Sequence, residues 1–197
     1  LITFDDGAKG VWRYADRILE RYDLHATAFI ITDSVGTNQP YYLTWNEMRQ
    51  MRDRGRWDFG AHTAAGHTRL PLDADGTESG PFLTNRIWLA DAHRLETFEE
   101  WRARVADDLD RNIRALVDHG FDPPLLFAHP FAAVTAPTND PAIPITLDRM
   151  VEERFAASVA NRPGAHPVGP NQIAARHLER IAVDRKSTRL NSSHLVI

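Results

Sequence analysis

The sequence contains no cysteine among its 197 residues. This absence excludes disulfide bonds, thiolate metal ligands and a cysteine nucleophile. A transition metal, if one is bound, must therefore be held by histidine and carboxylate side chains.

Long apolar runs and an excess of positive charge are absent as well. No apolar run approaches the ~20 residues of a membrane span, and no signal peptide is visible. The formal net charge of −4 argues against nucleic acid as a general partner, because that binding needs a basic face. With 43% hydrophobic and 25% charged residues, the chain has the composition of one soluble globular domain with a single core.

Both ends of the chain suggest that it is a fragment. It begins without methionine, inside what reads as a core strand, so the missing start leaves the compartment open. Residues 184–194, Asp-Arg-Lys-Ser-Thr-Arg-Leu-Asn-Ser-Ser-His, resemble one reading frame of a common sequencing adapter. We therefore expect a domain over residues 1–183, truncated at both ends, and a non-native tail over 184–197 that packs against nothing.

Apolar periodicity and turn residues predict alternating strands and helices. Strands are expected at residues 1–4, 26–31, 57–61, 125–128, 155–160 and 178–183. Helices are expected at 10–22, 45–54, 97–120 and 147–153, with capping boxes at Thr44/Glu47 and Thr97/Glu100. Residues 68–95 are expected to form a hairpin or lid beside the site. A β-α-β start of this kind implies a parallel sheet.

Two of the expected helices, residues 10–22 and residues 97–120, have an apolar pattern that predicts which side chains are buried. In residues 10–22 the stripe consists of Val11, Tyr14, Ile18, Leu19 and Tyr22. In residues 97–120 it consists of Trp101, Val105, Leu109, Ile113, Leu116 and Val117.

Two adjacent carboxylates, Asp5 and Asp6, follow the first strand and precede Gly7. Neighbouring side chains on a strand point to opposite faces, but the backbone turns at a strand end. One carboxylate can then bind a metal while the other stays available as a base. The alternative is an acidic turn that caps the next helix.

Two histidines, His62 and His67, follow the third strand and lie five positions apart. On a continuous helix they would point about 140° apart, so helix geometry cannot bring them together. They converge only if His62 ends the strand and Gly66 lets the loop turn back. The alternative is a buried structural His62 and a solvated His67.

These stretches resemble the motifs of a known family. Thr3-Phe4-Asp5-Asp6-Gly7 and the segment from His62 to His67 resemble the first two motifs of the NodB-type polysaccharide deacetylases, carbohydrate esterase family 4. The five-residue step between the histidines resembles the branch that acts on poly-β-1,6-N-acetylglucosamine. Residues 126–132 resemble the third motif, Arg-x-Pro-aromatic-Gly, with Ala128 in place of arginine and Ala132 in place of glycine.

The resemblance implies a fold and a reaction. The fold would be α/β, a distorted and incomplete (β/α) barrel. Asp6, His62 and His67 would hold one divalent metal, with Zn the first choice and Co, Ni or Fe as alternatives. Asp5 would be the general base, and the backbone N–H of Phe131 would bind the tetrahedral oxyanion.

The remaining expectations concern the substrate. The partner would be an N-acetylated polysaccharide or oligosaccharide, at an extracytoplasmic or cell-surface location. Pro130 and Trp88 would contact it, and His129 would line the groove or act as an acid. The missing arginine leaves Asp5 without its usual partner, and the usual general acid falls outside this sequence. A non-catalytic carbohydrate-binding relative and an amidohydrolase of small substrates are the alternatives.

Overall fold

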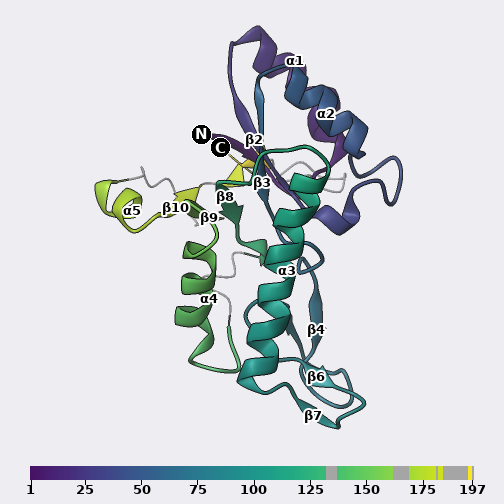
Figure 1. The fold of residues 1–197 in the computed structure, drawn as a ribbon, viewed down its shortest axis with the longest axis vertical. Helices are drawn as coiled ribbons and strands as arrows, with labels where there is room; N and C mark the ends of the chain where they lie inside the picture. Colours follow the sequence, from purple (N-terminus) through teal and green to yellow (C-terminus); the bar gives the residue numbers. More distant parts are fainter. Residues whose placement is uncertain (132–136, 162–168, 181, 184–194, 197) are drawn as a thin grey trace.

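The computed structural model describes residues 1–131, 137–161, 169–180, 182–183 and 195–196 (Figure 1). The third-motif residue Ala132 and tail residues 184–194 and 197 lie outside this range. The strands are β1 (Ile2–Phe4), β2 (Ala26–Ile30), β3 (Trp57–Ala61), β4 (Arg69–Pro71), β5 (Ser79–Pro81), β6 (Trp88–Leu89), β7 (Arg94–Leu95), β8 (Leu126–Ala128), β9 (Ala157–Asn161), β10 (His177–Arg180), β11 (Ala182–Val183) and β12 (Leu195–Val196). The helices are α1 (Lys9–Arg21), the short η1 (Thr32–Ser34), α2 (Trp45–Asp53), α3 (Phe98–Asp118), α4 (Ile143–Glu152) and α5 (Pro170–Ala174).

The main sheet is parallel over most of its width, as the β-α-β start predicts. Its order in the described residues is β10-β9-β8-β3-β2-β1-β12-β11, and the pairs from β10 to β1 are all parallel. The sheet is curled. Arg180 on β10 donates a hydrogen bond to Thr3 on β1 across 3.0 Å, although β9, β8, β3 and β2 lie between them in the sheet. The architecture is therefore the expected incomplete barrel.

Helices cover the sheet in two groups (Figure 1). Helices α1 and α2 lie together over β1, β2 and β3, where Phe4, Met48 and Trp57 belong to one buried cluster. The long α3 and α4 enclose a second cluster that includes Trp101 and Phe127. Within the described residues, no helix is long and apolar enough to cross a membrane.

Local signals in the sequence predict several element boundaries well. The capping boxes at the starts of α2 and α3 are both formed, each with Thr as N-cap and Glu three residues later. Helix α4 is an exception, because it begins at Ile143 instead of residue 147. Pro144 therefore lies in the first helical turn, where its missing N–H leaves no hydrogen bond unmade.

The predicted stripes of α1 and α3 are wrong in part. Tyr14, Ile18 and Tyr22 are 73%, 56% and 61% exposed, and Val117 is 43% exposed. The reason is that polar residues are buried as well, one on α1 and two on α3. In α1, Asp16 is buried and accepts a hydrogen bond of 2.8 Å from Trp57 Nε1, which turns that side of the helix inward.

In α3 the buried face likewise includes polar residues, Asp108 and Asn112. A pattern that counts only apolar residues therefore predicts the wrong face of the helix as the buried one.

Residues 68–95 are structured, as expected. They form two hairpins, β4 with β5 and β6 with β7. An ion pair with a buried carboxylate supports the region, in which Arg104 Nε lies 2.7 Å from Glu96 Oε1. The segment is thus a pair of small hairpins that follow the second histidine.

The tail does not behave as expected at its described residues. Strand β12 pairs antiparallel with β1, with Leu195 opposite Phe4 and Val196 opposite Thr3. The expectation that the tail contacts nothing is therefore wrong for these two residues, because the outer edge of β1 offers unpaired backbone groups. That residues 184–197 are non-native stays a prediction.

Candidate metal centre

The acidic pair lies in a sharp turn at the end of β1. Asp6 and Gly7 both have left-handed backbones, with φ of 70° and 74°. Asp is among the few residues that tolerate this region, and a Cβ on Gly7 would lie 3.3 Å from the Ile30 side chain. The turn directs the two carboxylates apart. Asp6 faces the histidines, and Asp5 faces Arg180.

Helix α3 holds the loop that carries the histidines. Asp108 accepts hydrogen bonds from the backbone N–H groups of Ala64 and Ala65, at 3.0 and 2.8 Å. The side-chain amide of Asn112 donates to the carbonyls of Ile30 (2.9 Å) and Thr63. These buried contacts tie the loop to a rigid helix, which fixes where both imidazoles lie.

The turn within this loop needs special residues. Thr63 has a φ of 75°, which is uncommon for a β-branched residue. A Cβ on Gly66 would lie 3.1 Å from Asp108 Oδ2 and 3.2 Å from Thr63 Cβ. Glycine at this position thus lets the loop pass close to α3 and return toward β1.

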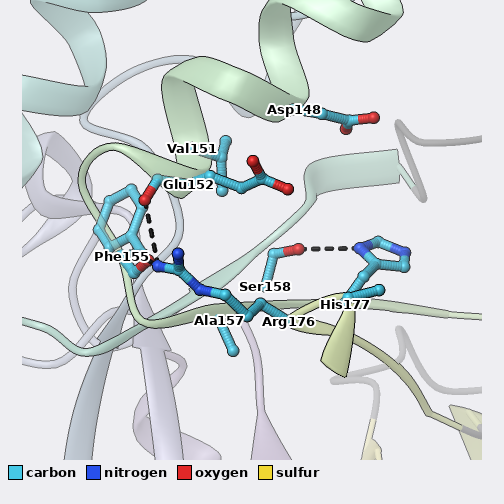
Figure 2. A pocket seen from close by; sticks show the side chains of 9 residues that line it. Asp148, Val151, Glu152, Phe155, Ala157, Ser158, Arg176 and His177 are labelled. Atoms are coloured by element: carbon cyan, nitrogen blue, oxygen red, sulfur yellow. Dashed lines mark hydrogen bonds between the residues drawn. The ribbon is translucent and has the colours of Figure 1, made fainter. Parts of the chain in front are cut away.

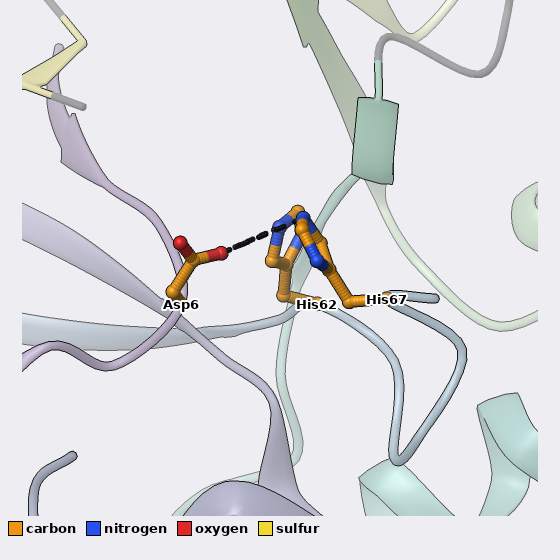
Figure 3. Close-up of side chains that lie close together, drawn as sticks. All are labelled: Asp6, His62 and His67. Atoms are coloured by element: carbon orange, nitrogen blue, oxygen red, sulfur yellow. Dashed lines mark ion pairs between the residues drawn. The ribbon is translucent and has the colours of Figure 1, made fainter. Parts of the chain in front are cut away.

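Figure 3 shows the result, in which Asp6, His62 and His67 converge. Asp6 Oδ1 lies 3.4 Å from His62 Nε2 and 3.6 Å from His67 Nε2. A tetrahedral centre with bonds of ~2.1 Å has ligand atoms about 3.4 Å apart. The three donor atoms all lie within 4.8 Å of one another, so the set fits one divalent metal.

The protonation of the histidines suits this role. His62 Nδ1 lies 2.8 Å from the Ala128 carbonyl oxygen, which can only accept, so Nδ1 donates and Nε2 is the nitrogen that binds a metal once the ring is neutral. Burial opposes charge on His62, but the carboxylates of Asp5 and Asp6 outweigh it and raise its pKa. The same negative charge attracts a cation. Burial and the neighbouring His62 lower the pKa of His67, which favours the neutral imidazole.

Asp5 has a partner that the sequence analysis did not identify. Arg180 Nη1 donates to Asp5 Oδ1 across 2.9 Å, and Nη2 donates to Asp5 Oδ2. The Arg180 side chain is 6% exposed. The sequence did contain a clue to this partner, because Arg180 lies inside the strand predicted at residues 178–183. An arginine that is buried in a strand needs a charged partner.

The third motif brings Phe131 to the site. The Phe131 ring lies 4.4 Å from that of His67, centroid to centroid, and Pro130 is buried beside it in the chain. Phe131 has a φ of 55°, a conformation that costs ~1–3 kcal/mol and is concentrated at functional sites. The structure thus places the Phe131 side chain next to a predicted metal ligand, and the oxyanion role of its backbone N–H stays a prediction.

His129 and Trp88 are less suited to the roles expected of them. Burial, with a smaller effect of His177, lowers the pKa of His129 to about 3. A side chain that is neutral near pH 7 cannot act there as a proton donor of imidazolium type, and at 3% exposure His129 offers little surface to a groove, so both roles stay predictions. Trp88 lies on β6, which Figure 1 shows near the start of α3 and apart from β1. Its contact with substrate stays a prediction.

Away from the Asp6, His62 and His67 cluster, a cleft of about 220 Å³ lies between α4 and β10 (Figure 2). Its polar lining includes Asp148, Ser158 and His177, three residue types of a hydrolytic triad. Ser158 Oγ lies 2.8 Å from His177 Nδ1. Among the described residues no hydrogen bond joins Asp148 to this histidine, so the residues do not form a relay.

Known proteins are similar to this chain in sequence and in fold. The family profile described as polysaccharide deacetylase matches residues 1–148. The curated poly-beta-1,6-N-acetyl-D-glucosamine N-deacetylases of Staphylococcus epidermidis and Staphylococcus aureus are 32% and 37% identical to this chain over 65 residues. Each alignment covers 32% of this chain and only 22% of the relative.

Solved structures show the same fold. The BpsB deacetylase domain of Bordetella bronchiseptica superposes with a TM-score of 0.73 at 19% identity, over 91% of this chain and 69% of that one. A de-N-acetylase of Aggregatibacter actinomycetemcomitans gives 0.74 at 17% identity, over 95% and 71%. IcaB of Ammonifex degensii gives 0.57 at 23% identity, over 88% and 70%. At these identities the likeness shows a shared curled half-barrel.

Proposed function

Because this chain belongs to the polysaccharide deacetylase family, we propose that it hydrolyses N-acetyl groups of a polymer that contains N-acetylglucosamine. The observation that carries the proposal is the convergence of Asp6, His62 and His67 beside a second carboxylate, Asp5, that faces away from them. A carbohydrate-binding relative would not need this division of labour between two adjacent carboxylates.

Asp6, His62 and His67 would hold one divalent metal, with Zn proposed first and Co, Ni or Fe as alternatives. When bound, such a metal supplies Lewis acidity that polarises the acetyl carbonyl and makes water a better nucleophile at neutral pH. The chain supplies two other parts of the reaction, and the proton that Asp5 takes up balances the one that the amine gains when the C–N bond breaks. Asp5 takes the proton of the attacking water, and the backbone N–H of Phe131 donates to the developing oxyanion.

The substrate and the cellular location are proposed from similarity to other proteins. We propose poly-β-1,6-N-acetylglucosamine as the substrate, because the five-residue step from His62 to His67 and the partial likeness to the Staphylococcus enzymes both favour it. We also propose an extracytoplasmic or cell-surface location, on the family resemblance alone.

The experiment measures acetate released from β-1,6-linked and β-1,4-linked N-acetylglucosamine oligomers by the metal-loaded protein. We expect release from the β-1,6 series, and a loss of roughly 10²-fold or more in Asp5→Asn, since a positioned base contributes ~10²–10⁴-fold. Asp58→Asn, an exposed carboxylate on β3, is the matched control and should keep full activity.

Each alternative gives a different result. Binding of oligomers without any acetate release would support the carbohydrate-binding relative. Release only from a small amide, with no turnover of oligomers, would support the amidohydrolase.

A further inference from the structure

We propose that Arg180 holds the carboxylate of Asp5 in the orientation of a base and keeps it out of the metal-ligand set. Arg180 thereby takes the place of the arginine that the third motif lacks at Ala128. The inference rests on the proposed function. Arg180 acts through Asp5, so it is a positioning residue.

The contact between the two side chains is bidentate. Nη1 and Nη2 of Arg180 each donate to a different oxygen of Asp5. This arrangement fixes the carboxylate plane as well as its position, which a single hydrogen bond would not do. A carboxylate offers about four lone-pair sites, so two remain to receive a proton from water.

The guanidinium is itself held on other sides. Nη1 also donates to Thr3 Oγ1 across 3.0 Å, and Nε donates to Asn161 Oδ1 across 2.8 Å. The guanidinium carbon lies 5.4 Å from the centroid of the Phe29 ring. Because β1, β9 and β2 each supply a contact, the arginine has one well-defined position inside the barrel.

The surroundings of Ala128 explain why the arginine comes from another strand. Ala128 is fully buried and packs in one cluster with Phe29 and Val159, with Leu178 against it. A long side chain at position 128 would have to displace this cluster. The curl of the sheet brings β10 within reach of β1 instead, so a small residue at 128 and an arginine at 180 are complementary.

The position of Asp5 makes this restraint necessary. Asp5 is adjacent to the proposed ligand Asp6, and its charge acts on His62. A freely rotating carboxylate there could bind the metal as a fourth protein ligand and no longer serve as a base. Pairing both of its oxygens with Arg180 prevents this movement.

A purely structural role for Arg180 is the competing explanation, because the side chain also joins β10 to β1. Thr3→Val is the control that separates the two. It removes the hydrogen bond between Thr3 and Arg180 but leaves the pairing of Arg180 with Asp5 in place. Thr3 is buried and takes no part in the proposed chemistry.

The first test is kinetic and uses the full chain loaded with metal. We expect Arg180→Ala to lower kcat for acetate release by about 10²-fold, the cost of a misplaced catalytic group, with little change in KM. Arg180→Lys and Thr3→Val should each lose much less, because both variants keep a cation beside Asp5. Equal losses in Thr3→Val and Arg180→Ala, or a folded Arg180→Ala with wild-type kcat, would overturn the inference.

The second test does not depend on turnover. The visible absorption of bound Co²⁺ reports its ligand set and geometry. We expect the Co²⁺ spectrum to change in Arg180→Ala, where Asp5 is released, and to return to that of the wild type in Arg180→Ala/Asp5→Asn. An unchanged spectrum in Arg180→Ala would refute the restraint on Asp5. Absence of acetate release by the wild type would instead refute the proposed function.

Discussion

The attachment of the histidine loop to α3 predicts that a buried carboxylate remote from the metal controls metal affinity. Asp108 is 2% exposed and accepts two backbone hydrogen bonds from the loop. In Asp108→Asn the remaining oxygen can accept only one of them, and the new amide N–H₂ faces the other donor. A buried donor left unpaired costs ~1–3 kcal/mol.

This cost sets the expected size of two measurements. The melting temperature should fall by roughly 2–12 °C, because 1 kcal/mol corresponds to about 2–4 °C in a chain of this size. Metal affinity should fall by roughly 10–100-fold, as is usual when groups that orient ligands are removed. Calorimetry measures the first effect, and competition with a chromophoric chelator measures the second.

The neighbouring Asp107 provides the control. It lies on the same helix, but its side chain is 63% exposed, and its ion pair with Arg114 is long at 3.7 Å. Asp107→Asn should change neither quantity. Wild-type metal affinity in a folded Asp108→Asn variant would show that α3 does not position the histidines.

Two further predictions concern the same region. Unfolded His129 titrates near its ordinary pKa of 6.5, whereas the folded group titrates at about 3, so the unfolded chain binds more protons between these values. Stability should therefore fall as the pH decreases from about 6.5 toward 3, and His129→Phe should weaken that dependence in urea titrations. Gly66→Ala should lower metal affinity by up to ~10²-fold, because its Cβ would lie 3.1 Å from Asp108 Oδ2. Wild-type affinity in Gly66→Ala would mean that the loop tolerates a shift at this position.

Sequence patterns predict those features that depend on neighbouring residues. The strand-turn-helix at Asp5 and Asp6 is local, and so are the capping boxes of α2 and α3. The placement of His62 at the end of β3 follows from a short apolar run. Because parallel strands end at the same edge of a sheet, these local predictions place the acidic pair near the histidines, and the resemblance to the family motifs then implies the ligand set.

The features that were missed depend on contacts between distant segments. Arg180 and Asp5 are 175 positions apart and meet only because the sheet curls. The rotation of α1 and α3 depends on Asp16 and Asp108, whose burial is favourable only with partners from other elements. A single sequence identifies such residues as polar, and polar residues are expected at the surface.

The central claim is that one metal held by Asp6, His62 and His67 supports deacetylation. The most direct measurement is acetate release by metal-free protein as Zn²⁺ is added in steps. The account predicts that release rises to a plateau at one metal per chain and is abolished, with metal binding, in His67→Ala. Release that needs no metal, or that persists in His67→Ala, would contradict it.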